Sequence, residues 1–157
     1  MTSTWGRCIA LGAAALLLVP QVEAQRAREL GMHAVFTAQE PELFAGGVYG
    51  GVRTTRRTRI AVTAAAGSAG GEFVARGELL GHFLLSPASQ NIGLYGGGGL
   101  AGIAGDGREQ GFLVLLIGLE HAPGGASGWY VEGGLGGGMR VAAGYRWRWF
   151  TGRRATR

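Results

Sequence analysis

Apolar side chains recur at every second position in several stretches of the chain. Near its end, the apolar positions are Met139, Val141, Ala143, Tyr145, Trp147 and Trp149. The alternate positions are Arg140, Ala142, Gly144, Arg146 and Arg148. Residues 72–85 repeat the pattern, with one face that carries Glu72, Arg76, Glu78 and His82. Successive side chains of a strand point to opposite sides, so this period of two predicts β-strands.

Weaker alternation extends the strand prediction over most of the chain. It is found at residues 59–66 and 129–135, and four further segments, 31–39, 43–54, 92–105 and 110–120, complete a count of eight. Residues 112–119 are apolar on both faces and break the pattern. The connections are short and rich in turn-forming residues, as in hairpins. We predict an all-β fold, a single antiparallel up-and-down barrel of about eight strands within residues 31–149.

The same alternation fits two kinds of barrel, and the placement of charges and aromatic residues separates them. A barrel in a membrane turns its apolar side chains outward to lipid and its polar side chains inward. Tyr145, Trp147 and Trp149 fall at one strand end, as an aromatic girdle at a membrane surface would. The interior charges would then be Glu72, Arg76, Glu78, His82, Glu132, Arg140, Arg146 and Arg148. Eight strands enclose only enough room for side chains, so we expect a filled barrel rather than a pore.

The first 24 residues have the pattern of a cleavable secretory signal peptide. Arg7 precedes an apolar run at residues 8–19, and the small-x-small site at 22–24 precedes Gln25. The run is shorter than the roughly 20 residues that a membrane-spanning helix needs. We therefore expect a barrel domain at residues 25–157, ending in a basic tail at 151–157. The one cysteine, Cys8, falls within the signal, so neither disulfides nor a thiolate metal site is expected in the domain.

Composition adds two constraints. The chain contains 32 glycines, but they are interleaved with apolar residues, which make up 46% of the chain. This composition favours an ordered fold over a flexible linker. The net charge is +5, and all 15 basic residues are arginine. In an exported chain, such a charge fits an anionic lipid surface better than nucleic acid, which we do not expect as a partner.

Motifs with possible chemistry give no catalytic, cofactor or metal site. Residues 97–102 match G-x-G-x-x-G, but that pattern binds dinucleotides only at a strand-to-helix turn. His33, His82 and His121 lack the spacing of metal ligands. His82 with Glu78 and Glu72 could form an acid–base group, which leaves a lipid-modifying enzyme open, whereas we expect His121 to be solvated beside a turn. The pairs at residues 56–57 and 153–154 are arginines, which can bind lipid phosphates or form solvated ends.

The signal, the eight segments and the aromatic strand at residues 144–150 resemble a family, the small eight-stranded outer-membrane β-barrels of Gram-negative bacteria, of OmpA type and opacity type. This resemblance implies an outer-membrane location, with membrane lipid and the barrel-insertion machinery as partners and lipopolysaccharide as a further candidate. It also implies a structural or surface-interaction role rather than an enzyme. The connections are shorter than the exposed loops of many relatives, so their adhesive roles are not implied. The alternatives are a soluble periplasmic barrel that binds a small apolar ligand, a lipid-modifying barrel enzyme and a glycine-rich membrane-associated helical protein, which the period of two argues against.

Overall fold

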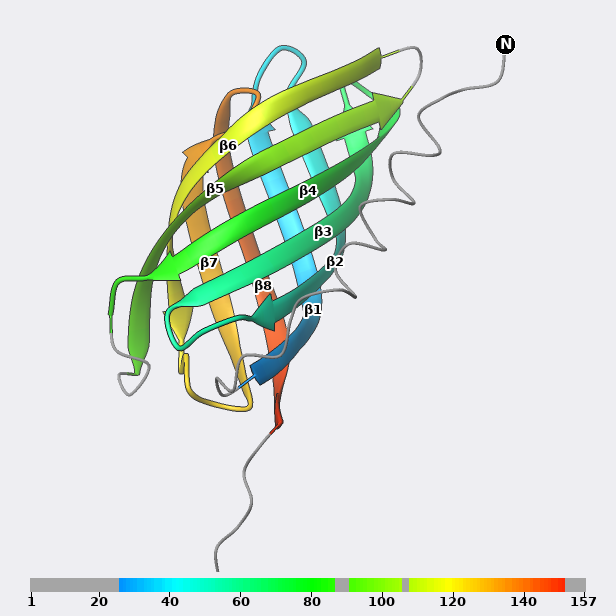
Figure 1. Cartoon of the computed structure of the whole chain (residues 1–157). Helices are drawn as coiled ribbons and strands as arrows, with labels where there is room; N and C mark the ends of the chain where they lie inside the picture. Colours follow the sequence, from blue (N-terminus) through cyan, green and yellow to red (C-terminus); the bar gives the residue numbers. More distant parts are fainter. Residues whose placement is uncertain (1–25, 87–90, 106–107, 152–157) are drawn as a thin grey trace, which may run out of the picture.

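Eight antiparallel strands close into one barrel in a computed structural model, which describes residues 26–86, 91–105 and 108–151 (Figure 1). The strands are β1 (Arg26–Ala38), β2 (Leu43–Arg53), β3 (Thr58–Ala69), β4 (Glu72–Leu84), β5 (Ile92–Gly105), β6 (Arg108–His121), β7 (Ser127–Leu135) and β8 (Met139–Thr151). Each strand pairs with the next, and β8 pairs with β1. The predicted fold is confirmed. The predicted signal peptide and residues 152–157 of the predicted tail lie outside the described residues.

Several strand boundaries differ from the prediction, and those of β1 and β3 differ most. β1 begins at Arg26 rather than at residue 31, because its first residues pair with the end of β8, where Arg26 faces Thr151. β3 continues to Ala69, so the turn that follows contains only Gly70 and Gly71. Their φ angles of 63° and 89° lie in the left-handed region that glycine adopts most easily.

The barrel has two different ends. β1 begins and β8 ends at the same end, at the bottom of Figure 1, and we call this the terminus end. The connections β2–β3, β4–β5 and β6–β7 lie there, and the remaining four connections lie at the opposite turn end. All seven connections span between two and seven residues, and the longest, residues 85–91, is at the terminus end. The barrel therefore has no long loop at either end.

Small residues inside the barrel make room for large ones. Tyr49, Tyr95 and Tyr130 are buried in the middle of the lumen. A Cβ atom on Gly118 would lie 2.5 Å from Cζ of Tyr95, and one on Gly144 would lie 2.5 Å from Cε1 of Tyr130. The glycine content is thus partly a packing requirement of a narrow lumen.

Apolar side chains fill the lumen at the turn end. This plug contains Val35, Leu43, Ala45, Ala65, Ala69, Val74, Ile103 and Ala142, with Phe112 packed against it. Residues 112–119 are apolar on both faces because their inward side chains also pack in the lumen, Phe112 against this plug and Val114 and Leu116 with the buried tyrosines. Val114 and Leu116 face the interior, whereas Leu113, Leu115 and Ile117 face outward.

Candidate functional site

The outer surface of the barrel is covered with large apolar side chains. They are Leu30, Met32, Phe36, Phe44, Val48, Phe73, Leu79, Phe83, Leu85, Ile92, Leu100, Leu113, Leu115, Ile117, Leu119, Trp129, Val131, Leu135, Met139, Val141, Tyr145, Trp147 and Trp149. Water-soluble monomers seldom expose a contiguous apolar patch of more than a few hundred Å². These residues lie on the outward face of seven strands, and on β3 the outward positions are the smaller or half-buried apolar residues Ile60, Val62, Ala64 and Ala66. Such a surface requires an apolar surrounding or partner.

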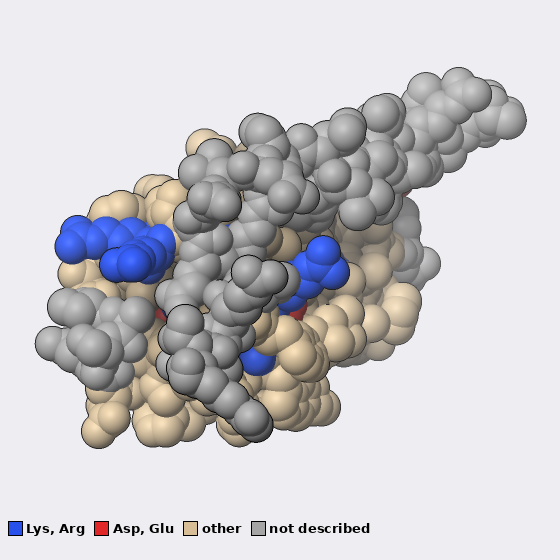
Figure 2. Space-filling view, turned by 60° about the horizontal axis from the view of Figure 1, so that its bottom comes forward, with Lys and Arg blue, Asp and Glu red and all other residues tan. Residues whose placement is uncertain are grey.

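Exposed charges are confined to the two ends among the described side chains of the strands and connections. The exposed arginines, Arg28, Arg56 and Arg57, lie at the terminus end, and Figure 2 shows basic groups on this face. The exposed carboxylates, Glu40, Glu42, Glu72 and Glu109, lie at the turn end. An uncharged band therefore separates a basic end from an acidic end.

The predicted aromatic girdle lies on the outer surface near the terminus end. Tyr145, Trp147 and Trp149 all point outward, and the rings of Tyr145 and Trp147 are 5.3 Å apart. Trp129 was not among the predicted girdle residues, and the strand register places it beside Tyr145. His121 is exposed, as expected next to a turn, and stacks on Trp129 with 5.9 Å between ring centroids.

Seven of the eight predicted interior charges lie inside the barrel. They are Arg76, Glu78, His82, Glu132, Arg140, Arg146 and Arg148. Glu72 is the exception, because β4 begins at this residue and its side chain is exposed at the rim of the turn end. The structure also buries four charged residues that the prediction omitted, namely Glu29, Arg53, Arg59 and Glu120.

The charges nearest the terminus end form one network, which we call the four-arginine cluster. It consists of Glu29, Glu120, Arg53, Arg59, Arg146 and Arg148. Each arginine lies within 4 Å of both carboxylates. The shortest contacts join Arg53 Nε to Glu29 Oε1 at 2.8 Å and Arg59 Nη1 to Glu120 Oε2 at 2.9 Å. Four guanidinium groups thus share two carboxylates.

A second network lies further towards the turn end, and we call it the two-arginine cluster. It consists of Arg76, Arg140, Glu78 and Glu132. Arg140 Nη2 lies 2.8 Å from Glu78 Oε2, and Arg140 Nη1 lies 2.9 Å from Glu132 Oε2. Arg76 Nε lies 2.8 Å from Glu78 Oε1, and its other nitrogens donate to Thr37 Oγ1 and to the carbonyl oxygen of Gly136. The charges in this cluster balance.

Three tyrosines lie between the clusters. The hydroxyl of Tyr95 donates to Glu132 Oε1 at 2.8 Å and accepts a hydrogen bond from Arg146 Nη2 at 3.4 Å. The guanidinium carbon of Arg146 lies 4.2 Å from the ring centroid of Tyr130 and 5.2 Å from that of Tyr49, within the range of cation–π attraction. Tyr95 therefore links the two clusters directly.

The structure separates His82 from Glu72, one of the two carboxylates of the predicted acid–base group, although His82 Nε2 lies 3.9 Å from Glu132 Oε1. His82 Nδ1 accepts a hydrogen bond from Arg59 Nε at 3.1 Å, whereas Glu72 is exposed at the opposite end of the barrel.

Within the described ranges, no group of three or more metal-ligating side chains could hold a metal ion. The G-x-G-x-x-G match at residues 97–102 lies inside β5 and not at a strand-to-helix turn. No helix in the described part of the chain is long and apolar enough to cross a membrane.

Comparison with known proteins gives a structural likeness only. No family model matches the chain, and no curated protein matches its sequence. The structure is similar to the N-terminal β-barrel domain of Pseudomonas aeruginosa OprF, with a TM-score of 0.55 and 14% identity over 77% of this chain and 97% of that domain. The chain has the barrel fold of that domain. A second similar structure is Ail, the attachment invasion locus protein of Yersinia pestis, with a TM-score of 0.46 and 11% identity over 82% of this chain and 99% of Ail.

Proposed function

We propose that this chain is an outer-membrane β-barrel protein with a structural or surface-interaction role, and that it is neither a pore nor an enzyme. The observation that carries the proposal is the inverted placement of side chains. Ten charged side chains from seven of the strands are buried inside, while large apolar side chains cover the outside. This arrangement is unfavourable in water and favourable in lipid.

The dimensions of the apolar band support a membrane location. The strands contain 9 to 14 residues, and a tilted strand needs about 9–11 residues to cross the hydrocarbon core. Outward aromatic residues mark both edges, with Phe36, Phe44 and Phe73 towards the turn end and the girdle towards the terminus end. Phe73 and Phe83 are ten positions apart on β4, which corresponds to about 25 Å along the barrel axis at the usual strand tilt.

A filled lumen supports a role other than transport. The apolar plug, the tyrosines and both charged clusters occupy successive levels inside the barrel. We therefore propose that its contacts are made by its outer surface and its two ends. The expected partners are membrane lipid, lipopolysaccharide and the barrel-insertion machinery, and we expect no nucleic acid. A soluble periplasmic barrel for a small apolar ligand would need an apolar lumen, and the six buried arginines do not favour it.

The proposal is tested by placing a charge on the middle of the outer band. Leu115 is 65% exposed at the centre of β6. Arginine at such a depth costs about 2–4 kcal/mol in a membrane barrel. Leu115→Arg should reduce the fraction of the protein that stays in carbonate-washed membranes and shows heat-dependent migration in SDS gels. Thr55→Arg, in the exposed β2–β3 connection, is the matched control and should behave as the parent chain. Recovery of the unsubstituted protein in the soluble fraction, with no heat-dependent shift, would contradict the proposal.

A further inference from the structure

The four-arginine cluster carries more positive than negative charge. Four guanidinium groups surround two carboxylates, which leaves an excess of two positive charges. The side chains of Arg59, Arg146 and Arg148 are fully buried, and that of Arg53 is 6% exposed. Uncompensated charge is costly away from water. The carboxylates of the cluster therefore neutralise only half of its positive charge.

The described neighbours do not neutralise the rest of that charge. Glu78 and Glu132 lie with Arg76 and Arg140 in the balanced two-arginine cluster. His82 uses Nδ1 as an acceptor for Arg59, so it brings no negative charge. Tyr49 donates its hydroxyl to Glu29 at 3.2 Å and Tyr95 donates to Glu132, whereas the hydroxyl of Tyr130 is hydrogen-bonded to His33 Nδ1.

Unused hydrogen-bond donors indicate the same shortage. Arg59 Nη2, Arg146 Nε and Arg148 Nε are buried and have no acceptor in the described structure. Arg148 Nε lies 3.4 Å from Glu29 Oε1, but without hydrogen-bond geometry. In the two-arginine cluster, by contrast, all three nitrogens of Arg76 and of Arg140 donate to an oxygen. Buried polar groups are normally satisfied by protein, water or bound ions, so these three donors can serve an acceptor that the protein itself does not provide.

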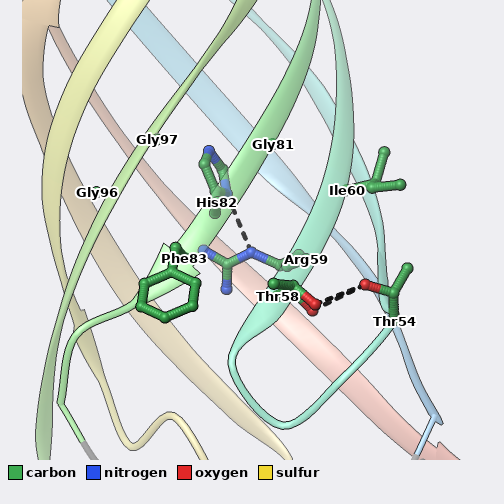
Figure 3. A pocket seen from close by; sticks show the side chains of 9 residues that line it. All are labelled: Thr54, Thr58, Arg59, Ile60, Gly81, His82, Phe83, Gly96 and Gly97. Carbon is green, nitrogen blue, oxygen red and sulfur yellow. Dashed lines mark hydrogen bonds between the residues drawn. The ribbon is translucent and has the colours of Figure 1, made fainter.

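Space is available beside the cluster. Arg59 and His82 help to line a hollow of about 570 Å³ on the side of the barrel, together with Thr54, Thr58 and Phe83. Figure 3 shows the guanidinium of Arg59 next to the His82 ring, with Thr54 and Thr58 nearby at the β2–β3 connection. The hollow reaches the cluster at Arg59 alone, near the terminus end, and its other lining residues belong to the barrel wall and the β2–β3 connection.

We propose that the four-arginine cluster binds a small inorganic anion, either a halide or a phosphate-like oxyanion. The anion accepts hydrogen bonds from the free nitrogens of Arg59, Arg146 and Arg148 and offsets the excess positive charge. Guanidinium groups suit this task because they stay charged and present several fixed donors. The inference concerns the lumen alone and does not depend on the membrane location proposed above.

The test compares the thermal stability of the refolded barrel in detergent in different sodium salts at equal ionic strength. Chloride, bromide and phosphate are titrated against gluconate, which is too bulky for the cluster. We expect at least one of the small anions to raise the melting temperature saturably by several degrees, because a ligand that binds only the folded state stabilises it. A response to chloride and bromide alone identifies a halide site, and a response to phosphate alone identifies an oxyanion site. Equal melting temperatures in all four salts would overturn the proposal.

Substitutions in each cluster show which of the two causes the anion-dependent change in melting temperature. Arg53→Gln combined with Arg59→Gln leaves two arginines and two glutamates in the cluster, and it should abolish the anion response. Arg76→Gln in the two-arginine cluster should lower the melting temperature in every salt and keep the response. An undiminished response in the double variant would overturn the assignment to this cluster. If the double variant does not fold, crystals of the unsubstituted barrel decide, grown in the anion that raised the melting temperature, with bromide in place of chloride for a halide site. Density for that anion is expected within hydrogen-bond distance of the three free nitrogens, and its absence refutes the site.

Discussion

The two charged clusters inside the barrel use the same residue types at the same burial, yet they differ in charge balance. The two-arginine cluster joins Arg140 of β8 to Glu78 of β4 and Glu132 of β7, and its arginine nitrogens are all bonded. The four-arginine cluster draws Glu29 from β1 and Glu120 from β6 and leaves donors free. The first cluster is complete within the protein, whereas the stability of the second should depend on its surroundings.

The largest loss of stability is expected when one arginine is removed from the two-arginine cluster. Arg140→Gln leaves Glu78 and Glu132 buried with less positive charge, and the loss of one partner of a buried ion pair costs about 3–5 kcal/mol. Urea unfolding of the refolded barrel should show this loss. Arg140→Lys keeps the charge but not the geometry of the three nitrogens. Its free energy of unfolding should lie between those of Arg140→Gln and the parent chain. If Arg140→Gln lowered the free energy of unfolding less than Arg53→Gln does, the expected order of the two clusters would be wrong.

Removal of the link between the clusters should have the next largest effect. Tyr95→Phe deletes the hydrogen bond to Glu132 and the acceptor for Arg146. Hydrogen bonds to charged groups contribute about 1.5–3 kcal/mol, and we expect a loss of free energy of unfolding in this range. A double-mutant cycle with Arg140→Gln measures the coupling. Strictly additive effects would show that Tyr95 does not connect the two networks.

Packing around the same tyrosine gives a further prediction. In Gly118→Ala, the new Cβ would lie 2.5 Å from Cζ of Tyr95 and should displace the ring from both clusters. Overpacking of this kind costs about 1–3 kcal/mol, measurable by urea unfolding. Gly133→Ala on β7 is the matched control, because its Cβ would meet no atom within 4 Å. If both alanine variants were equally stable, the lumen would be looser than the structure indicates.

The smallest expected effect is that of Arg53→Gln. Glu29 keeps Arg59, Arg146 and Arg148 within ion-pair distance after this change, and the excess positive charge falls from two to one. The loss of one ion pair and the relief of repulsion oppose each other, so we expect a net change of no more than about 1 kcal/mol in gluconate. In the salt whose anion stabilises the parent chain, the melting temperature of Arg53→Gln should rise less than that of the parent chain. A large loss in gluconate would mean that the cluster is balanced without an anion.

Alternation along the chain was sufficient to predict the eight strands and the facing of most side chains. Arg76, His82 and Arg148 lie inside, and Trp147 and Trp149 lie outside, as their positions in the pattern indicate. The prediction failed at strand ends, where few residues remain to define a period. Glu72 is exposed because β4 begins there, and Glu29 was omitted because β1 begins earlier than the pattern showed. Glu120 stood next to an expected turn, but β6 extends to His121 and buries it.

The composition of each charged cluster was decided only by the tertiary structure. Arg140 and Glu78 are 62 positions apart, and Arg146 and Glu29 are 117 apart. A period of two assigns a side chain to the inside or the outside, because it depends only on the backbone of one strand. The height of that side chain in the lumen, and hence its ion-pair partner, depends on strand register and tilt, which are set when β8 closes on β1. Facing was therefore determined by the sequence pattern, and the pairing of buried charges by the closure of the barrel.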